Sequence, residues 1–293
     1  MKALIFGAGG QDGSYLADVC RSIKIEPVGI SRSGNWIRGD VADAGFVKEC
    51  IREHSPAYVF HLAANSTTRH DALYENHAAI STGALNLLEA VYSLKLPARV
   101  FIAGSGVQFF NDGSPISEST PFDAASAYAV ARIHAVYAAR YYRRLGVKAY
   151  VGYFFHHESP SRKPDHLSQR IVQAAKRIKN GSEEILQIGD LSVEKEWTFA
   201  GDVARAALTL VGQERHFEAI IGSGEAHSIR EWVELCFGGL GLDWRKHVRQ
   251  IPGYRAEFAK LVSDPRRIRS LGWLPAVGFK ELCAMMMDAP SPS

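Results

Sequence analysis

The sequence begins with the stretch "KALIFGAGGQDGSYLAD" (residues 2–18), in which a short apolar run leads into a glycine-rich turn. Gly7, Gly10 and Gly13 recur at intervals of three residues, and an amphipathic segment follows them. Glycines in this pattern permit a tight turn, a close approach of the backbone to a pyrophosphate, and close packing of a helix on a strand. The stretch therefore predicts the first strand, phosphate-binding loop and first helix of a dinucleotide-binding fold.

Apolar runs and helical patterns then alternate along the chain. The expected strands are "KALIFG", "EPVGIS", "AYVFHLA", "RVFIAG" and "KAYVGYFF", and the expected helices lie near 12–24, 44–54, 78–94 and 126–146. This alternation is typical of a parallel sheet with right-handed crossovers and helices on both faces. The sequence thus predicts an α/β fold with a Rossmann-like doubly wound parallel sheet.

The pattern loosens after "FFHHESPSRKPDH" (154–166). We expect residues 1–155 to form the NAD(P)-binding Rossmann domain. Residues 156–287 should form a smaller C-terminal substrate-binding region, parts of which pack back on the first domain. The polar segment 288–293 is predicted to be a disordered tail.

Composition and charge limit the classes of partner that we expect the protein to bind. The net charge is +3 over 293 residues, and the one short basic cluster, "RYYRR" (140–144), lies at the end of a predicted helix, where cations complement the helix dipole. We therefore expect no nucleic-acid partner. No apolar stretch approaches the roughly 18 residues of a membrane span, so we expect no membrane partner. Four widely spaced cysteines without metal-ligand spacing predict reduced thiols and a cytoplasmic location.

The end of the second expected strand bears on cofactor choice. An NAD-selective site usually presents an acidic residue there for the ribose 2′-hydroxyl, whereas this chain has Arg32 between Ser31 and Ser33. A guanidinium with two hydroxyls suits a 2′-phosphate, so NADP is favoured over NAD. The alternative is that Arg32 is a solvated loop cation. Asp40 could hold the adenine amine, or it could cap a helix that begins near Ala42.

The segment "SAYAVARIHA" (126–135) places Tyr128 and Arg132 one helical turn apart on the same face. A free tyrosine titrates near pH 10, and ionisation near pH 7 requires roughly 4 kcal/mol of preferential stabilisation of the phenolate. A fixed cation can supply much of that stabilisation. The pair is thus a candidate acid/base site, the alternative being a core aromatic beside a surface cation.

Several segments together resemble the extended short-chain dehydrogenase/reductases, and more narrowly the GDP-mannose 4,6-dehydratases and GDP-4-keto-6-deoxymannose reductases. They extend over nearly the whole chain: "GAGGQDGSYLAD", "VFHLAANS", "ESTPFDAASAYAVAR", "HHESPSR" and "EKEWTFAGDVARA". The resemblance implies NADP bound at the amino-terminal sheet and a GDP-sugar held between the two regions.

The resemblance also implies a catalytic set of Ser105, Tyr128 and Arg132. Tyr128 would exchange a proton with the sugar 4-oxygen, Ser105 would hydrogen-bond that oxygen, and Arg132 would stabilise the phenolate and hold the cofactor. The family carries lysine where this chain has Arg132. Arginine keeps the positive charge but cannot release its proton, and its planar fork differs from a compact ammonium.

Further site residues follow from the same motifs. The expected cofactor-binding residues are Gly7, Gly10, Gln11, Asp12, Gly13, Arg32, Asp40, Val41, Leu62, Ala63, Ala64, Tyr128 and Arg132. The expected substrate-binding residues are Ser66, Gln108, His157, Glu158, Arg162 and Arg255. Lys163 and Arg170 could join Arg162 in clamping a diphosphate, or each of the three could be a solvated surface cation. His156 and His157 are adjacent on an expected strand and point to opposite faces, so we predict no metal site.

Two departures concern the reaction. In the dehydratases a glutamate closely follows the catalytic Ser/Thr, whereas here Ser105 is followed by Gly106, Val107 and Gln108. None of these three can act as a general base near neutral pH, so elimination of water is poorly supported. The short stretch from Ser33 to Asp40 also lacks a loop through which the dehydratases build their tetramer. Both departures favour reductase or dehydrogenase chemistry and a homodimer.

The function that we expect is therefore NADP-dependent oxidoreduction at C4 of a GDP-linked (deoxy)sugar, as a keto-reductase or a dehydrogenase. One alternative is a GDP-mannose 4,6-dehydratase with a displaced carboxylate, for which Glu118 and Asp123 are the nearest acidic residues. A nucleotide-sugar epimerase is another. A non-catalytic nucleotide-binding protein of the same fold is the alternative from a different class.

Overall fold

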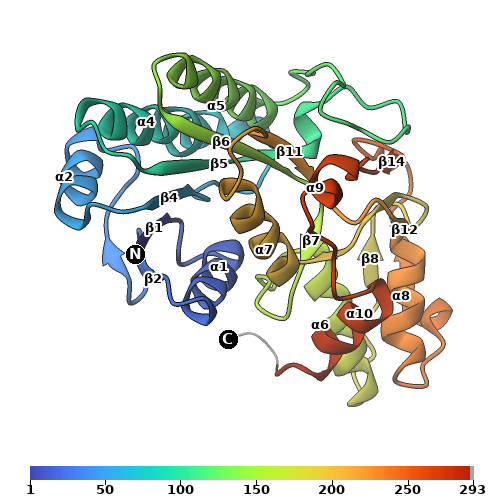
Figure 1. Cartoon of the computed structure of the whole chain (residues 1–293). Coiled ribbons are helices and arrows are strands. Elements are labelled where there is room, and N and C mark those ends of the chain that lie inside the picture. Colours follow the sequence, from blue (N-terminus) through green and yellow to red (C-terminus); the bar gives the residue numbers. More distant parts are fainter. Residues whose placement is uncertain (291–293) are drawn as a thin grey trace.

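The computed structural model describes residues 1–290 and is built around one seven-stranded sheet (Figure 1). The strand order is β11-β6-β5-β4-β1-β2-β3, and every pairing is parallel. The strands are β1 (Lys2–Phe6), β2 (Glu26–Ser31), β3 (Ile37–Arg38), β4 (Tyr58–His61), β5 (Arg99–Ser105), β6 (Lys148–Phe154) and β11 (Glu218–Ile221). The order reverses between β1 and β4, which opens a crevice at their carboxyl ends. The predicted doubly wound α/β fold is confirmed.

Alternating strand residues form two apolar layers, one on each face of the sheet. In β1, Leu4 and Phe6 join one layer, whereas Ala3 and Ile5 join the other. Three helices cover the first face and two cover the second (Figure 1). The first group is α2 (Ala44–His54), α4 (Gly83–Ser93) and α5 (Ala127–Arg144), and the second is α1 (Gln11–Ser22) and α7 (Ala200–Val211).

Side-chain caps fix the start of two helices near the crevice. The Ser126 hydroxyl accepts a hydrogen bond from the Ala129 N–H at 3.1 Å, so α5 begins immediately before Tyr128. The cap of α2 is Asp43, whereas Asp40 accepts a hydrogen bond from the Ala42 N–H at 2.9 Å. The suggested capping role of Asp40 for α2 is therefore wrong.

The segment before α4 differs from the single helix expected at 78–94. A short 3₁₀ turn, η1 (His70–Ala72), leads into α3 (Leu73–Asn76), and a π-helical stretch, η2 (His77–Thr82), precedes α4. The Ser81 hydroxyl in this stretch donates to the carbonyl of Ala131 in α5 at 3.2 Å. The widened turns therefore lie directly against the helix that carries Tyr128.

A third apolar cluster organises the C-terminal region around a stack of Trp197 on Trp232, with ring centroids 4.4 Å apart. Its helices are α6 (Leu167–Lys179), α8 (Ile229–Gly238) and α10 (Phe279–Asp288), with α9 (Arg266–Ser270) beside β11. Its small sheets pair β7 (His157–Glu158) with β10 (Thr198–Phe199), β9 (Glu194–Glu196) with β12 (Ala226–Ser228) and β14 (Lys260–Leu261), and β8 (Leu186–Ile188) with β13 (Val248–Gln250). Short 3₁₀ turns are η3 (Gly106–Gln108) and η4 (Trp244–Lys246).

Two elements of the C-terminal half return to the first sheet: β11 pairs with β6, and α7 packs on α1. The tail predicted at 288–293 begins in the last turn of α10, and its residues 291–293 lie outside the described part of the chain. All four cysteines are buried free thiols. Within residues 1–290, no helix combines the length and apolarity that crossing a bilayer requires.

A partly buried carboxylate, Glu218, joins β11 to α5. Glu218 accepts hydrogen bonds from Arg140 at 2.7 Å and from the Tyr153 hydroxyl at 2.6 Å, and it also pairs with Arg143. Burial acts against the charged form, but these three donors prevail and lower the pKa of Glu218 from its ordinary 4.5 to about 2. The edge strand β11 is thus linked to α5 through a charged carboxylate that these three donors stabilise.

We expect Glu218→Gln to lower the free energy of unfolding by about 2 kcal/mol at pH 7, because two arginines then lose their counter-charge in a largely buried site. The native pKa lies below 4.5, so the stabilisation is complete above that value and disappears as the pH falls through about 2. The difference between wild type and variant should therefore shrink between pH 5 and pH 3 in urea unfolding.

Glu214→Gln is the matched control, because Glu214 also pairs with two cations, Arg99 and Lys148, but in solvent. It should change stability far less than Glu218→Gln. Equal effects of the two substitutions would contradict the assignment.

Candidate active site

The glycine loop shapes the crevice between β1 and α1. Gly7 has φ +97°, and a Cβ on Gly13 would lie 2.4 Å from the Gly7 carbonyl oxygen and 2.6 Å from Ala8 Cα. Any side chain at position 13 would therefore push α1 away from the loop. Helix α1 starts at Gln11 without a side-chain cap, so its first N–H groups are free to bind an anion at the crevice.

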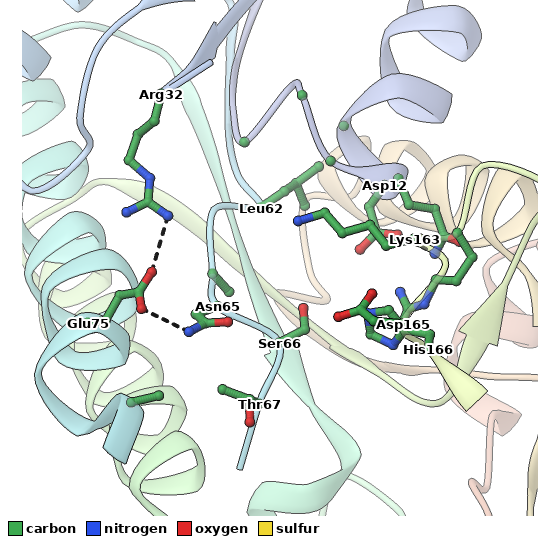
Figure 2. Close-up of a pocket in the computed structure, with 18 of the residues that line it drawn as sticks. Asp12, Arg32, Leu62, Asn65, Ser66, Thr67, Glu75, Lys163, Asp165 and His166 are labelled. Atoms are coloured by element: carbon green, nitrogen blue, oxygen red, sulfur yellow. Dashed lines mark hydrogen bonds and ion pairs between the residues drawn. The ribbon is translucent and has the colours of Figure 1, made fainter. Parts of the chain in front are cut away.

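A cavity of about 830 Å³ lies over this loop, and we call it the cofactor cavity (Figure 2). A smaller cavity of about 210 Å³ adjoins it at the ends of β1 and β2 and includes Ser31, Arg32 and Ser33. Arg32 pairs with Glu75 of α3 at 3.3 Å, and Glu75 also accepts from Asn65 at 2.9 Å. The guanidinium of Arg32 is more than half exposed and remains accessible from both cavities.

Lys163 enters the cofactor cavity from the C-terminal region. The sequence allowed it a role in clamping a diphosphate of the substrate, but the structure places it on the walls of both the cofactor cavity and the smaller cavity beside Arg32. Figure 2 shows its side chain extended into the cavity from the segment that also carries Asp165 and His166, with Arg32 on the far side. Two cations from different regions thus approach one cavity.

A third cavity, of about 270 Å³, contains Ser105, Tyr128 and Arg132, and we call it the catalytic cavity. Arg132 is 5% exposed and donates hydrogen bonds to the Ala103 carbonyl at 2.5 Å and to the Tyr128 hydroxyl oxygen at 2.9 Å. Its guanidinium carbon lies 4.9 Å from the centre of the tyrosine ring. Because the phenol oxygen accepts from Arg132, its own O–H is free to donate into the cavity.

A histidine behind Arg132 stays neutral. His61 is completely buried in β4 and donates from Nε2 to the Ile80 carbonyl at 3.2 Å. Burial, assisted by the charge of Arg132, lowers the pKa of His61 to about 4. At neutral pH His61 therefore adds no second positive charge beside Arg132.

The glycine loop is linked across the crevice to the segment that follows β6. His157 donates from Nε2 to Asp12 at 2.8 Å and from Nδ1 to the Phe155 carbonyl at 2.7 Å, and the Ser159 hydroxyl donates to Gln11 at 2.8 Å. Both ring nitrogens of His157 face acceptors, which favours the charged imidazolium. Although burial opposes both charges, the pair raises the pKa of His157 and lowers that of Asp12 to about 2.

A second polar cluster lies beside the catalytic cavity. The Nε2 atom of His156 is 2.9 Å from both the Lys195 ammonium nitrogen and a Glu158 oxygen, and its Nδ1 donates to the Glu196 carbonyl at 2.7 Å. Arg162 pairs with the other oxygen of Glu158 at 3.3 Å. Within this cluster His156, Lys195 and Arg162 line the catalytic cavity.

The structure gathers most of the expected site residues on the walls of the three cavities. These are Gly7, Gly10, Gln11, Asp12, Gly13, Arg32, Asp40, Val41, Leu62, Ala63, Ala64, Ser66, Ser105, Tyr128, Arg132, His157 and Arg162. Three others lie elsewhere. Gln108 is fully buried and accepts from the Ser105 N–H at 2.8 Å, Glu158 is 1% exposed behind the wall, and Arg255 is solvent-exposed away from these walls. Neighbouring backbone and charged groups enclose Gln108 and Glu158, and the expected contact of these two residues with a substrate stays a prediction.

Sequence reasoning did not select Lys195. One signal was available: Lys195 alternates with Val193 and Trp197, so an extended chain would place it on the face that those apolar residues bury. Its closeness to His156 depends on chain pairing that sequence patterns do not reveal.

Comparisons with known proteins extend over the same residues. The family model described as GDP-mannose 4,6 dehydratase matches residues 4–286. GDP-mannose 4,6 dehydratase 1 of Arabidopsis thaliana is 32% identical over 319 residues, which cover 98% of this chain and 88% of that protein.

Among solved structures, the UDP-glucose 4-epimerase of Thermus thermophilus in complex with NAD has a TM-score of 0.85 at 22% identity, covering 99% of this chain and 98% of that one. RMD of Pseudomonas aeruginosa complexed with NADPH has a TM-score of 0.86 at 21% identity, covering 98% and 96%. At these identities the two structures show a shared fold.

We expect Gly13→Ala to weaken binding of a pyridine dinucleotide about tenfold or more, because the added methyl overlaps the Gly7 carbonyl and displaces α1 from the loop. Calorimetric titration with the dinucleotide measures the change. Gly238→Ala is the control, since a Cβ there meets open space. Unchanged affinity in Gly13→Ala would show that α1 does not have to approach the loop this closely.

Proposed function

The chain belongs to the GDP-mannose 4,6-dehydratase family, and from that premise we propose that this enzyme transfers hydride between NADP(H) and C4 of a GDP-linked sugar, as a keto-reductase or dehydrogenase. The observation that carries the proposal is the hydrogen bond from Arg132 to Tyr128 in a cavity that also contains Ser105. It supports a working acid/base site despite the replacement of lysine.

Bound NADPH would supply the hydride, and the uncapped start of α1 and the glycine contacts suit its pyrophosphate. In the direction of reduction, the Tyr128 O–H donates its proton to the sugar 4-oxygen. The phenolate that forms is stabilised by the buried Arg132, whose charge is weakly screened there. Ser105 hydrogen-bonds the same sugar oxygen and fixes its position. In the direction of oxidation the proton moves back to Tyr128.

The carboxylates argue against the family's usual elimination. Among the described residues, the only carboxylate on the wall of the catalytic cavity is Asp12, and His157 neutralises it. Glu118 accepts from the Ile220 N–H at 2.9 Å and faces Arg267, away from that wall. Asp123 lines a neighbouring cavity of about 710 Å³, so it is the remaining candidate if the enzyme is a dehydratase with a displaced carboxylate.

The preference for NADP rests on Arg32 and Lys163, which can pair with a 2′-phosphate from two sides. RMD, the structural neighbour named above, binds NADPH, whereas the epimerase binds NAD. Arg32 already has Glu75 as a partner, so phosphate binding would require it to exchange that contact.

The rest of the proposal concerns partners. A GDP-sugar would lie between the catalytic cavity and the 710 Å³ cavity, which share Val107, Phe258 and Leu261. A homodimer is supported by exposed Tyr137 and Tyr141 on α5. Cytoplasmic location fits the free thiols.

The direct test is incubation of the enzyme with NADPH and GDP-4-keto-6-deoxymannose, followed by absorbance of the reduced nicotinamide and by product mass. We expect stoichiometric NADPH consumption and gain of two hydrogens. Tyr128→Phe should lose about 10²–10⁴-fold in kcat, since it removes the acid/base. Loss of water from GDP-mannose without net cofactor consumption would instead identify a dehydratase. Cofactor binding without turnover of any GDP-sugar would indicate a binding protein.

In the same assay Arg132→Lys should lower kcat rather than raise it, although lysine is the family's residue. The guanidinium reaches the Ala103 carbonyl and the Tyr128 hydroxyl with two different nitrogens, and a single ammonium nitrogen is less suited to hold both contacts. A gain of activity in Arg132→Lys would show that the arginine limits the chemistry.

Arg32→Ala and Lys163→Ala should each reduce the preference for NADPH over NADH about tenfold, the equivalent of one charged contact to a phosphate. The ratio of kcat/KM for the two cofactors measures this preference. Arg21→Ala on the outer face of α1 is the control and should leave the ratio unchanged. An equal loss with both cofactors would place the two cations at the pyrophosphate instead.

A further inference from the structure

The catalytic cavity contains a second group able to exchange protons, the amine of Lys195. Unlike the phenol of Tyr128 it is a base, and it comes from another region of the chain. Tyr128 and Arg132 come from α5 at one part of the wall, whereas Lys195 comes from β9 in the C-terminal region. All three border one space of about 270 Å³, which is smaller than a nucleotide sugar. A sugar ring bound in this space can therefore contact residues from both parts of its wall.

The contacts of Lys195 allow one proton to lie either on Lys195 or on His156. His156 donates from Nδ1 to the Glu196 carbonyl, so in its neutral form its Nε2 has only a lone pair. That lone pair can accept from the Lys195 ammonium at 2.9 Å, but it then faces a Glu158 oxygen, also at 2.9 Å, without a proton between them. If the proton moves from Lys195 to His156, the imidazolium can donate to Glu158 and Lys195 becomes a neutral amine. The distances suit both arrangements, and the lower pKa of His156 favours the one with the proton on Lys195.

The surrounding charges set the balance between these arrangements. Burial lowers the pKa of Lys195 to about 8, with Glu158 opposing and Arg162 assisting the shift. Burial, then the charge of Lys195, lowers the pKa of His156 to about 4. The other charged pair on the same wall, Asp12 with His157, is internally neutralised. Lys195 thus gives up its proton more readily than an ordinary lysine does.

We propose that Lys195 is a carbon-acid base: in a 4-keto sugar bound against Tyr128, it removes a proton from a carbon next to the ketone. The electron pair of that C–H bond becomes the C=C bond of an enolate, and the carbonyl π electrons move to the 4-oxygen, beside the Tyr128 hydroxyl. Return of a proton from Lys195 restores the ketone. The step consumes no cofactor and gives the enzyme an enolisation activity separate from hydride transfer.

This inference rests on the proposed function for its substrate class, but the two can fail separately. Enolisation needs no hydride, so it is measured with GDP-4-keto-6-deoxymannose and NADP⁺ in D₂O, where reduction cannot occur. Proton NMR follows loss of the signals at C3 and C5 against a sample without enzyme. We expect enzyme-dependent deuterium incorporation at one of these carbons, with a rate that rises with pH and levels off above about pH 8.

Two variants identify the base. Lys195→Met and Lys195→Arg should each slow the exchange at least about 100-fold, because neither side chain can accept a proton at this pH. Lys195→Arg keeps the positive charge, and we expect it to bind the GDP-sugar within about threefold of wild type. Lys48→Met on the outer face of α2 is the control for exposed lysines and should exchange at the wild-type rate. Melting temperatures and NADPH binding verify that each variant is folded.

Three outcomes would overturn the inference. Wild-type reduction of the 4-keto sugar without any deuterium incorporation would leave hydride transfer intact and exclude the enolisation. Full exchange in Lys195→Arg would assign the base to another group. A raised KM for the GDP-sugar in Lys195→Met, with exchange at saturation unchanged, would make Lys195 a binding residue for the diphosphate. Exchange without reduction by NADPH would instead sink the hydride-transfer proposal and leave the base in place.

Discussion

The ion pair between Asp12 and His157 holds the crevice in a fixed shape. Asp12 lies in the first turn of α1, and His157 follows the strand that carries the sheet toward its far edge. Because the pair is partly buried and both ring nitrogens of His157 are used, a shift of the glycine loop would separate two charges that now neutralise each other. The cofactor cavity, the catalytic cavity and the link between Gln11 and Ser159 all depend on that fixed separation.

The arginine at position 132, where the family carries lysine, is accommodated by a contact to the backbone of β5. The guanidinium of Arg132 divides its donors between a strand carbonyl and the phenol, so it is held rigidly while remaining charged. An arginine in this place stabilises a phenolate but cannot pass a proton onward. In the proposed reaction, protons would be transferred by Tyr128 itself or by groups outside α5, and Lys195 with His156 is one such cluster on the same wall.

Much of the fold was predictable because the strands of a parallel sheet are buried on both faces and read as apolar runs. The strand expected from "EPVGIS" is β2, Glu26–Ser31, with the same bounds, and the helix expected at 44–54 is α2. Short strands such as β9 were missed, since two or three residues become a strand only when distant partners pair with them. The π-helical turn at 77–82 was missed because its pattern of apolar residues fits an ordinary helix.

The site was predictable where its residues belong to recognisable segments, at the end of β5 and in the first turns of α5. Ser105, Tyr128 and Arg132 do meet in one cavity, as the resemblance implied. Gln108 and Glu158 follow the ends of β5 and β6, yet their side chains turn inward, Gln108 to a backbone N–H and Glu158 to Arg162 and His156. The direction in which such a polar side chain points depends on which nearby polar groups need a partner in the folded chain. For the same reason the alternation of Lys195 with Val193 and Trp197 indicated only a buried face, and its closeness to His156 could not be read from the sequence.

The position of β11 has a consequence for synthesis of the chain. Strand β6 pairs with β5 on one side, but its other edge is covered only by residues 218–221. While the intervening segment is still being made, an edge rich in aromatic and β-branched residues stays open on the ribosome. Unpaired parallel edges of this kind are slow to close and prone to join other chains. A chain that ends after β6 would keep that edge permanently, so completing the first sheet requires β11 from the C-terminal half.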